Sequence, residues 1–147
     1  MKRMQLNEAI KYAKRLLKFR LRSRAELRDR LLMKGFDAET VEAALESLER
    51  SGFLDDEKFA YLYADDMLTV HGYGPLKIKM KLKQLKVDEE VIERVLERVM
   101  KEEDVKQIMR RILEKEKLEG PKAREYLFRR GFTAKEIDLL KEGGAEM

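Results

Sequence analysis

The chain has 147 residues, of which 44% are hydrophobic, and this is enough for one globular domain with a buried core. It has no cysteine and no apolar run near the roughly 20 residues that cross a bilayer, so disulfides and cysteine-ligated metals are excluded and we expect a cytoplasmic protein without membrane contact. Its 33 basic and 29 acidic residues leave a net charge of +4, and the basic excess lies at the N-terminal end, densest from Lys11 to Lys34.

A threefold internal repeat organises the chain. A shift of 51 residues places Tyr12 on Tyr63 and Asp37 on Asp88, and a further shift of 45 places Asp88 on Thr133. Self-similarity at such a period is typical of repeat proteins, in which each unit packs on its neighbours. The predicted units are residues 1–54, 55–101 and 102–147.

Within each unit, apolar residues recur three and four positions apart, which is the spacing of an amphipathic helix. The sequence therefore predicts an all-α fold of three tandem three-helix repeats in an elongated, curved array. The nine predicted helices lie near residues 7–20, 23–34, 38–51, 55–70, 75–85, 88–100, 102–117, 121–130 and 134–142.

Polar residues mark where several of these helices begin. Ser23 and Thr133 are each followed three residues later by glutamate, a pattern that predicts capping boxes. Asp37, Asp88 and Thr133 occupy equivalent positions before the third helix of each unit, where a side-chain oxygen can accept a hydrogen bond from a free backbone N–H. These signals set the helix starts independently of the apolar pattern.

The segment from Lys77 to Lys83 alternates lysine with apolar residues, which locally resembles a strand. Pro75 suits the first turn of a helix, and the repeat aligns this segment with Leu27 and Leu31 of the second predicted helix. We therefore expect a helix here, with the lysines spread over a wide face.

Three adjacent acids, Asp55, Asp56 and Glu57, raise the question of metal or acid–base chemistry. Adjacent residues point in different directions around a helix, so they are better suited to the helix start, with Asp55 as the N-cap. The single histidine, His71, has no partner at metal-ligand spacing. We therefore predict no catalytic residues, no metal site, no cofactor and no small-molecule substrate, and hence no enzyme.

Basic side chains are the remaining candidates for function. We assign partner binding to two groups, which we name the arginine corner and the lysine run. For these lysines, a merely solvated helix face stays an equal alternative. The arginine corner consists of Arg20, Arg22, Arg24 and Arg28, and the lysine run consists of Lys77, Lys79, Lys81 and Lys83.

Four motifs occur in a characteristic order along the chain. They are RLRSRAEL at 20–27, KGF at 34–36, GFLDDEKFA at 52–60 and GYGPLKI at 72–78. Together with the threefold repeat, this order resembles the RecX family of bacterial recombinase regulators over about residues 9–140. Lys86 differs from the glycine that the family pattern usually has after the second helix of the middle repeat.

The resemblance implies a protein of tandem three-helix repeats that lies in the groove of the RecA recombinase filament. It further implies inhibition or modulation of ATP hydrolysis, strand exchange and filament growth, with DNA as a further partner of some members. The alternative interpretation is a basic helical module that binds nucleic acid independently of the recombinase, because three-helix units can imitate helix-turn-helix domains.

Overall fold

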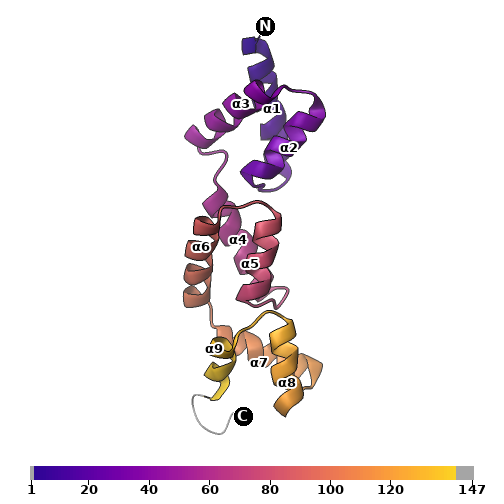
Figure 1. Cartoon of the computed structure of the whole chain (residues 1–147), viewed down its shortest axis with the longest axis vertical. Helices are drawn as coiled ribbons and strands as arrows, with labels where there is room; N and C mark the ends of the chain where they lie inside the picture. Colours follow the sequence, from indigo (N-terminus) through magenta and orange to yellow (C-terminus); the bar gives the residue numbers. More distant parts are fainter. Residues whose placement is uncertain (1, 142–147) are drawn as a thin grey trace.

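Nine α-helices and a terminal 3₁₀ turn form an elongated array in the computed structural model, which describes residues 2–141 (Figure 1). The described part contains no strand, and the prediction of an all-α fold is confirmed. The first unit contains α1 (Lys2–Phe19), α2 (Arg24–Lys34) and α3 (Ala38–Arg50). The second contains α4 (Asp56–Thr69), α5 (Pro75–Gln84) and α6 (Glu89–Glu102). The third contains α7 (Val105–Glu116), α8 (Gly120–Arg129), α9 (Ala134–Ile137) and the 3₁₀ turn η1 (Asp138–Lys141).

Most of the predicted helix starts are confirmed. Ser23 caps α2 by accepting from the Glu26 N–H, Asp37 caps α3, and Asp55 caps α4 by accepting from the Lys58 N–H. Thr133 forms the predicted capping box at α9. At the start of α2, however, the Glu26 carboxylate binds arginines, so only the serine half of that box has formed.

Two other predictions need correction. Asp88 is at the N-cap position of α6, but its side chain makes no capping hydrogen bond. The helix predicted over 134–142 is divided into the short α9 and the 3₁₀ turn η1, with residue 142 outside the described range. The last turn of a helix often tightens into a 3₁₀ turn in this way.

The segment from Lys77 to Lys83 lies in α5, as the repeat predicts. Pro75 occupies the first turn, where its missing N–H costs no hydrogen bond. Ile78 and Leu82 are fully buried, so the period-two pattern places only alternate apolar residues in the core. The strand interpretation is wrong because contacts with the other helices of the unit, and not local alternation, decide the conformation.

The buried apolar residues form two cores rather than three. One core belongs to the first unit alone and is built around Leu27, Leu31 and Leu45. The other is continuous across the second and third units, where Phe59 and Ile78 belong to the same cluster as Phe132. Tyr12 and Tyr63, which occupy equivalent positions of the repeat, each pack against one of these cores.

The helices of each unit take equivalent places around the long axis. Figure 1 shows α2, α5 and α8 on one side of the array, and α3, α6 and α9 on the other. Each second helix is therefore presented at a similar position along one side of the molecule. This arrangement makes that side the natural place to look for an extended binding surface.

Candidate partner-binding surfaces

The arginine corner follows α1 and is largely occupied by ion pairs within the chain. Arg20 binds the Glu26 carboxylate through both terminal nitrogens, and Arg22 binds the same carboxylate at 2.5 Å. Arg22 also donates to the Leu16 carbonyl oxygen and is only 8% exposed. The assignment of Arg22 to partner binding assumes exposure, whereas its guanidinium is mostly buried; contact with a partner stays a prediction.

Arg24 and Arg28 converge on Glu42 of α3, at 3.1 and 2.8 Å, and Arg24 also pairs with Glu49 at 3.0 Å. The hydrogen bond from Arg28 is the main reason that the pKa of Glu42 is lowered, and the Arg24 pair adds to it. These ion pairs are half-exposed, so each stabilises the fold only modestly. A partner that binds Arg24 or Arg28 must compete with the carboxylates of Glu42 and Glu49.

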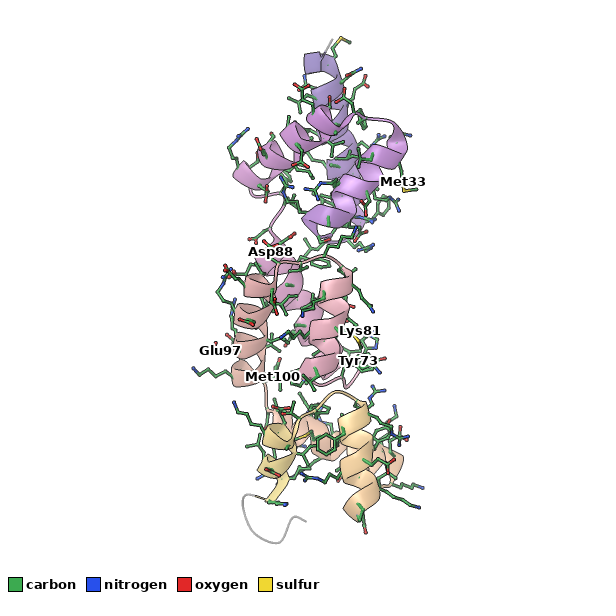
Figure 2. All side chains as sticks on the ribbon, viewed as in Figure 1. Met33, Tyr73, Lys81, Asp88, Glu97 and Met100 are labelled. Carbon is green, nitrogen blue, oxygen red and sulfur yellow. The ribbon has the colours of Figure 1, made fainter. Side chains whose placement is uncertain are left out.

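The lysine run lies on α5, and these α5 lysines divide into two pairs on opposite flanks of the helix. Lys77 and Lys81 lie over the Tyr73 ring, at 4.9 and 5.2 Å from its centroid. Lys79 and Lys83 approach the Glu89 carboxylate at 3.7 and 3.5 Å. Figure 2 shows Tyr73 and Lys81 close together beside α5. The helix itself carries four lysines and no acid, so it is strongly basic in spite of these contacts.

The sequence did not predict that the Tyr73 ring lies among the cations of this region. Arg130 of the third unit lies 4.3 Å from the Tyr73 ring centroid and donates to the carbonyl oxygens of His71 and Gly72. The Tyr73 ring is thus in contact with three cationic side chains, two lysines of the second unit and Arg130 of the third. The Gly-Tyr-Gly-Pro motif indicated a loop before a helix, but nothing in it indicated that Arg130, in another unit, would contact it.

Charge is divided between the two sides of the array. The second helices of the units, α2, α5 and α8, contain eleven basic and three acidic residues, whereas α3 and α6 contain four basic and nine acidic ones. Since α2, α5 and α8 lie on one side of the array (Figure 1), their basic residues form a line along that side, which we call the basic row. Such a row attracts an acidic partner that extends over several units.

The carboxylates of the described residues give no sign of a metal centre. Over residues 2–141, no group of three or more histidine, aspartate or glutamate side chains could hold a metal ion. Asp55, Asp56 and Glu57 have separate partners: the Lys58 N–H, the Arg24 N–H and Arg94 respectively. In the same part of the chain, each helix is too short or too polar to cross a membrane.

Comparison with known proteins decides the family. Family models described as the first and second three-helix domains of RecX match residues 9–48 and 55–96. The chain belongs to the RecX family. Regulatory protein RecX from Thermotoga maritima is 42% identical over 97% of this chain and 90% of its own length. A protein of the same name from Thermus thermophilus is 38% identical over 86% of this chain and 84% of its own.

Solved structures agree with this assignment at the level of the fold. A crystal structure of regulatory protein RecX has a TM-score of 0.77 at 19% identity and covers 96% of this chain and 73% of its own. RecX from Lactobacillus salivarius has the same TM-score at 18% identity, over 92% of this chain and 93% of its own. The three-unit array is therefore the architecture of this RecX family member.

Proposed function

We propose that this RecX family member binds the RecA recombinase filament and inhibits or modulates its ATPase, strand exchange and growth. Membership of a family of regulatory proteins is the observation that carries the proposal. The shape supports it, because an elongated array with equivalent helices along one side suits a partner that itself repeats. A regulatory role requires no catalytic group in this chain.

The basic row supports the choice of contact surface. Lys79 and Lys83 are the clearest of the predicted contact residues, because the carboxylate that both approach belongs to Glu89, whose own side chain is 60% exposed. Such exposed pairs are weak, and a partner carboxylate can replace Glu89 at little cost. Arg20, Arg24 and Arg28 remain proposed contacts that must first exchange a carboxylate, whereas Arg22 acts through the shape of the corner.

The test is DNA-dependent ATP hydrolysis by the cognate RecA protein with increasing amounts of this protein, together with co-sedimentation with the filament. We expect the rate to fall and the protein to sediment. The double variant Lys79→Glu, Lys83→Glu should weaken both effects about tenfold or more. Lys58→Glu, an exposed lysine on α4, is the control for a charge change away from the basic row. An unchanged ATPase rate without co-sedimentation of the wild-type protein would refute the proposal.

Direct binding to DNA is a second candidate, and α1 is the observation that favours it. Lys11, Lys14, Arg15 and Lys18 are all exposed on this helix. Glu8 is the only acid within its bounds. This function predicts recombinase-independent binding to an oligonucleotide that weakens steeply between 50 and 200 mM salt, on the order of 10³-fold for about six phosphate contacts. Binding that does not depend on salt, or no binding at 50 mM, would exclude it.

A further inference from the structure

Helix α5 carries apolar residues on two opposite faces. Successive residues of an α-helix are rotated by roughly 100°, so residues four apart lie nearly above one another. Ile78 and Leu82 share the face that enters the core, and both are fully buried. Leu76 and Met80 share the face directed away from it and are 58% and 52% exposed. We call these two residues the α5 ridge.

Lysines flank the α5 ridge on both sides. Lys77 and Lys81 run along one flank, and Lys79 and Lys83 run along the other. Their neighbours hold them away from the ridge itself, since the first pair lies over Tyr73 and the second approaches Glu89. The outward surface of α5 is thus a narrow apolar strip between two rows of positive charge.

This combination discriminates between kinds of partner. Phosphates of a nucleic-acid backbone pair with lysines but offer no apolar surface to Leu76 and Met80. An acidic protein segment with apolar residues at helical spacing satisfies both features, because its apolar side chains cover the ridge while its carboxylates meet the lysines. The charge of α5 therefore selects an acidic segment, and the ridge selects a protein segment.

We infer that the α5 ridge, with its flanking lysines, is the docking site for an acidic, amphipathic segment of a protein partner. The inference deepens the proposed function, on which it rests for the identity of the partner, by naming the kind of segment that α5 binds. It also explains why lysines and apolar residues alternate here. Ile78 and Leu82 stabilise the unit, and Leu76 and Met80 remain outside for the partner.

The test uses a probe that does not depend on the filament. The probe is a 16-residue helical peptide, rich in glutamate, with leucines three and four positions apart, and the control peptide has serine at each leucine. Protein-detected NMR measures binding and locates it. We expect shifts confined to α5 and its neighbours, at least fivefold weaker binding of the serine peptide, and loss of about tenfold in affinity for Leu76→Ser, Met80→Ser.

A matched variant controls for the loss of exposed apolar surface. Leu62→Ser, Val70→Ser removes two side chains of similar exposure, 45% and 69%, from positions of the second unit outside α5. It should bind the peptide as the wild type does. The inference is overturned if the wild type shows no shifts on α5, if the serine peptide binds equally well, or if Leu76→Ser, Met80→Ser retains wild-type affinity.

The same variants in the co-sedimentation assay separate the inference from the proposed function. If the peptide binds α5 but the wild-type protein does not sediment with the filament, the proposed function fails and the docking site stands. If the protein sediments but Leu76→Ser, Met80→Ser sediments equally, the filament uses another surface and the inference fails. Loss of oligonucleotide binding in parallel with filament binding would make the ridge a nucleic-acid contact, which also overturns the inference.

Discussion

The array has two joints, the first between the first and second units and the second between the second and third. They use equivalent positions of the repeat but different chemistry. At the first joint, the Ser23 hydroxyl of the first unit donates to the Leu85 carbonyl oxygen of the second. At the second joint, the repeat places Gly74 and Arg130 at these positions, and the Gly74 N–H donates directly to the Arg130 carbonyl oxygen at 2.8 Å. The second joint is thus a contact between two backbones, whereas the hydrogen bond at the first joins a side chain to a backbone group.

Glycine accounts for the difference. A Cβ at Gly74 would collide with the backbone of Phe132 and lie 2.6 Å from the Gly131 carbonyl oxygen. Gly131 is equally tight, since its Cβ would lie 2.7 Å from the Lys77 backbone nitrogen. At the first joint the equivalent positions are Ser23 and Lys86, which both carry a Cβ, and the hydrogen bond there comes from the Ser23 hydroxyl. The apolar core then continues across the second joint but stops at the first.

Polar groups take the place of the core at the first joint. The Asp56 carboxylate, in the first turn of α4, accepts from the Arg24 N–H at the start of α2 at 2.7 Å. A carboxylate near the positive end of a helix is stabilising. Neighbouring units of the same repeat can therefore be joined either through a shared apolar core or through hydrogen bonds. The residues at two repeat positions, Gly74 and Gly131 at the second joint and Ser23 and Lys86 at the first, decide which of the two forms. The first unit is expected to open independently of the other two.

The largest effect is expected from Phe132→Ala, which removes the largest fully buried side chain of the shared core. Cavities of this kind cost about 3–5 kcal/mol. We expect the second and third units to lose protection from hydrogen exchange together, while the first unit keeps its own. Leu45→Ala in the core of the first unit is the matched variant, and it should lower protection from hydrogen exchange in the first unit only. Equal loss of protection throughout the chain would mean that the two cores unfold as one.

Gly74→Ala should come next, because the new Cβ meets backbone atoms that cannot easily move. We expect a loss of about 3 kcal/mol in the free energy of unfolding of the second and third units, at the upper end of overpacking effects. Gly52→Ala is the control, since Gly52 has positive φ but open space around it. That variant should cost about 1 kcal/mol. Denaturant titration compares them, and equal losses would disprove the close backbone contact.

The first joint should depend on Asp56 and on pH. Asp56→Ala removes the acceptor of the Arg24 N–H and should cost about 1 kcal/mol, while Asp56→Asn keeps an acceptor and should cost less. Burial is the main reason that the pKa of Asp56 is raised, although the Arg24 hydrogen bond opposes it. A raised pKa means that the folded state holds the proton more tightly. This contribution to stability is therefore full below the ordinary pKa of 3.8 and is lost as the pH rises through the folded pKa.

The pH dependence is best measured as a difference between variants. Subtracting the unfolding free energy of Asp56→Asn from that of the wild type, from pH 7 to pH 4, isolates the Asp56 contribution. The difference should move in favour of the wild type on acidification. Glu42 contributes in the opposite direction because its pKa is lowered, but it is common to both proteins and cancels. A difference that moves toward the variant would contradict the assigned shift.

The smallest effect is a gain. Lys86 adopts φ 61° after α5, a conformation that costs a residue with a Cβ about 1 kcal/mol or more. Lys86→Gly should therefore raise the free energy of unfolding by about 0.5 kcal/mol, after allowing for the greater freedom of glycine in the unfolded chain. Gly35 and Gly131 already occupy the equivalent positions with positive φ. A lower melting temperature for this variant would show that the Lys86 side chain stabilises the first joint.

Local signals made most of the fold predictable. Asp37, Asp55 and Thr133 cap helices where the sequence places them, because a cap depends only on residues three positions away. The helix over Pro75–Gln84 was predictable because the repeat supplies information that a seven-residue pattern lacks. Membership of the RecX family was equally visible in the order of four short motifs.

The candidate surfaces were less predictable, because exposure depends on contacts between distant residues. The sequence predicted the basic excess around Arg22. It did not predict that the Arg22 guanidinium would be held within the fold by hydrogen bonds to Glu26 and to the Leu16 carbonyl oxygen. It also predicted the α5 lysines without the ridge between them, since which apolar residues of α5 face outward depends on what packs behind the helix.

The amino-acid sequence by itself determined the helices, their threefold register and the family, because periodicity, caps and motifs are properties of neighbouring residues. The tertiary structure alone decided that the three units share two cores, that Gly74 and Gly131 bring one joint into backbone contact, and that Leu76 and Met80 remain exposed. The physical reason is that burial and ion pairing are settled by which segments meet, and in this chain the segments that meet can lie a whole repeat apart.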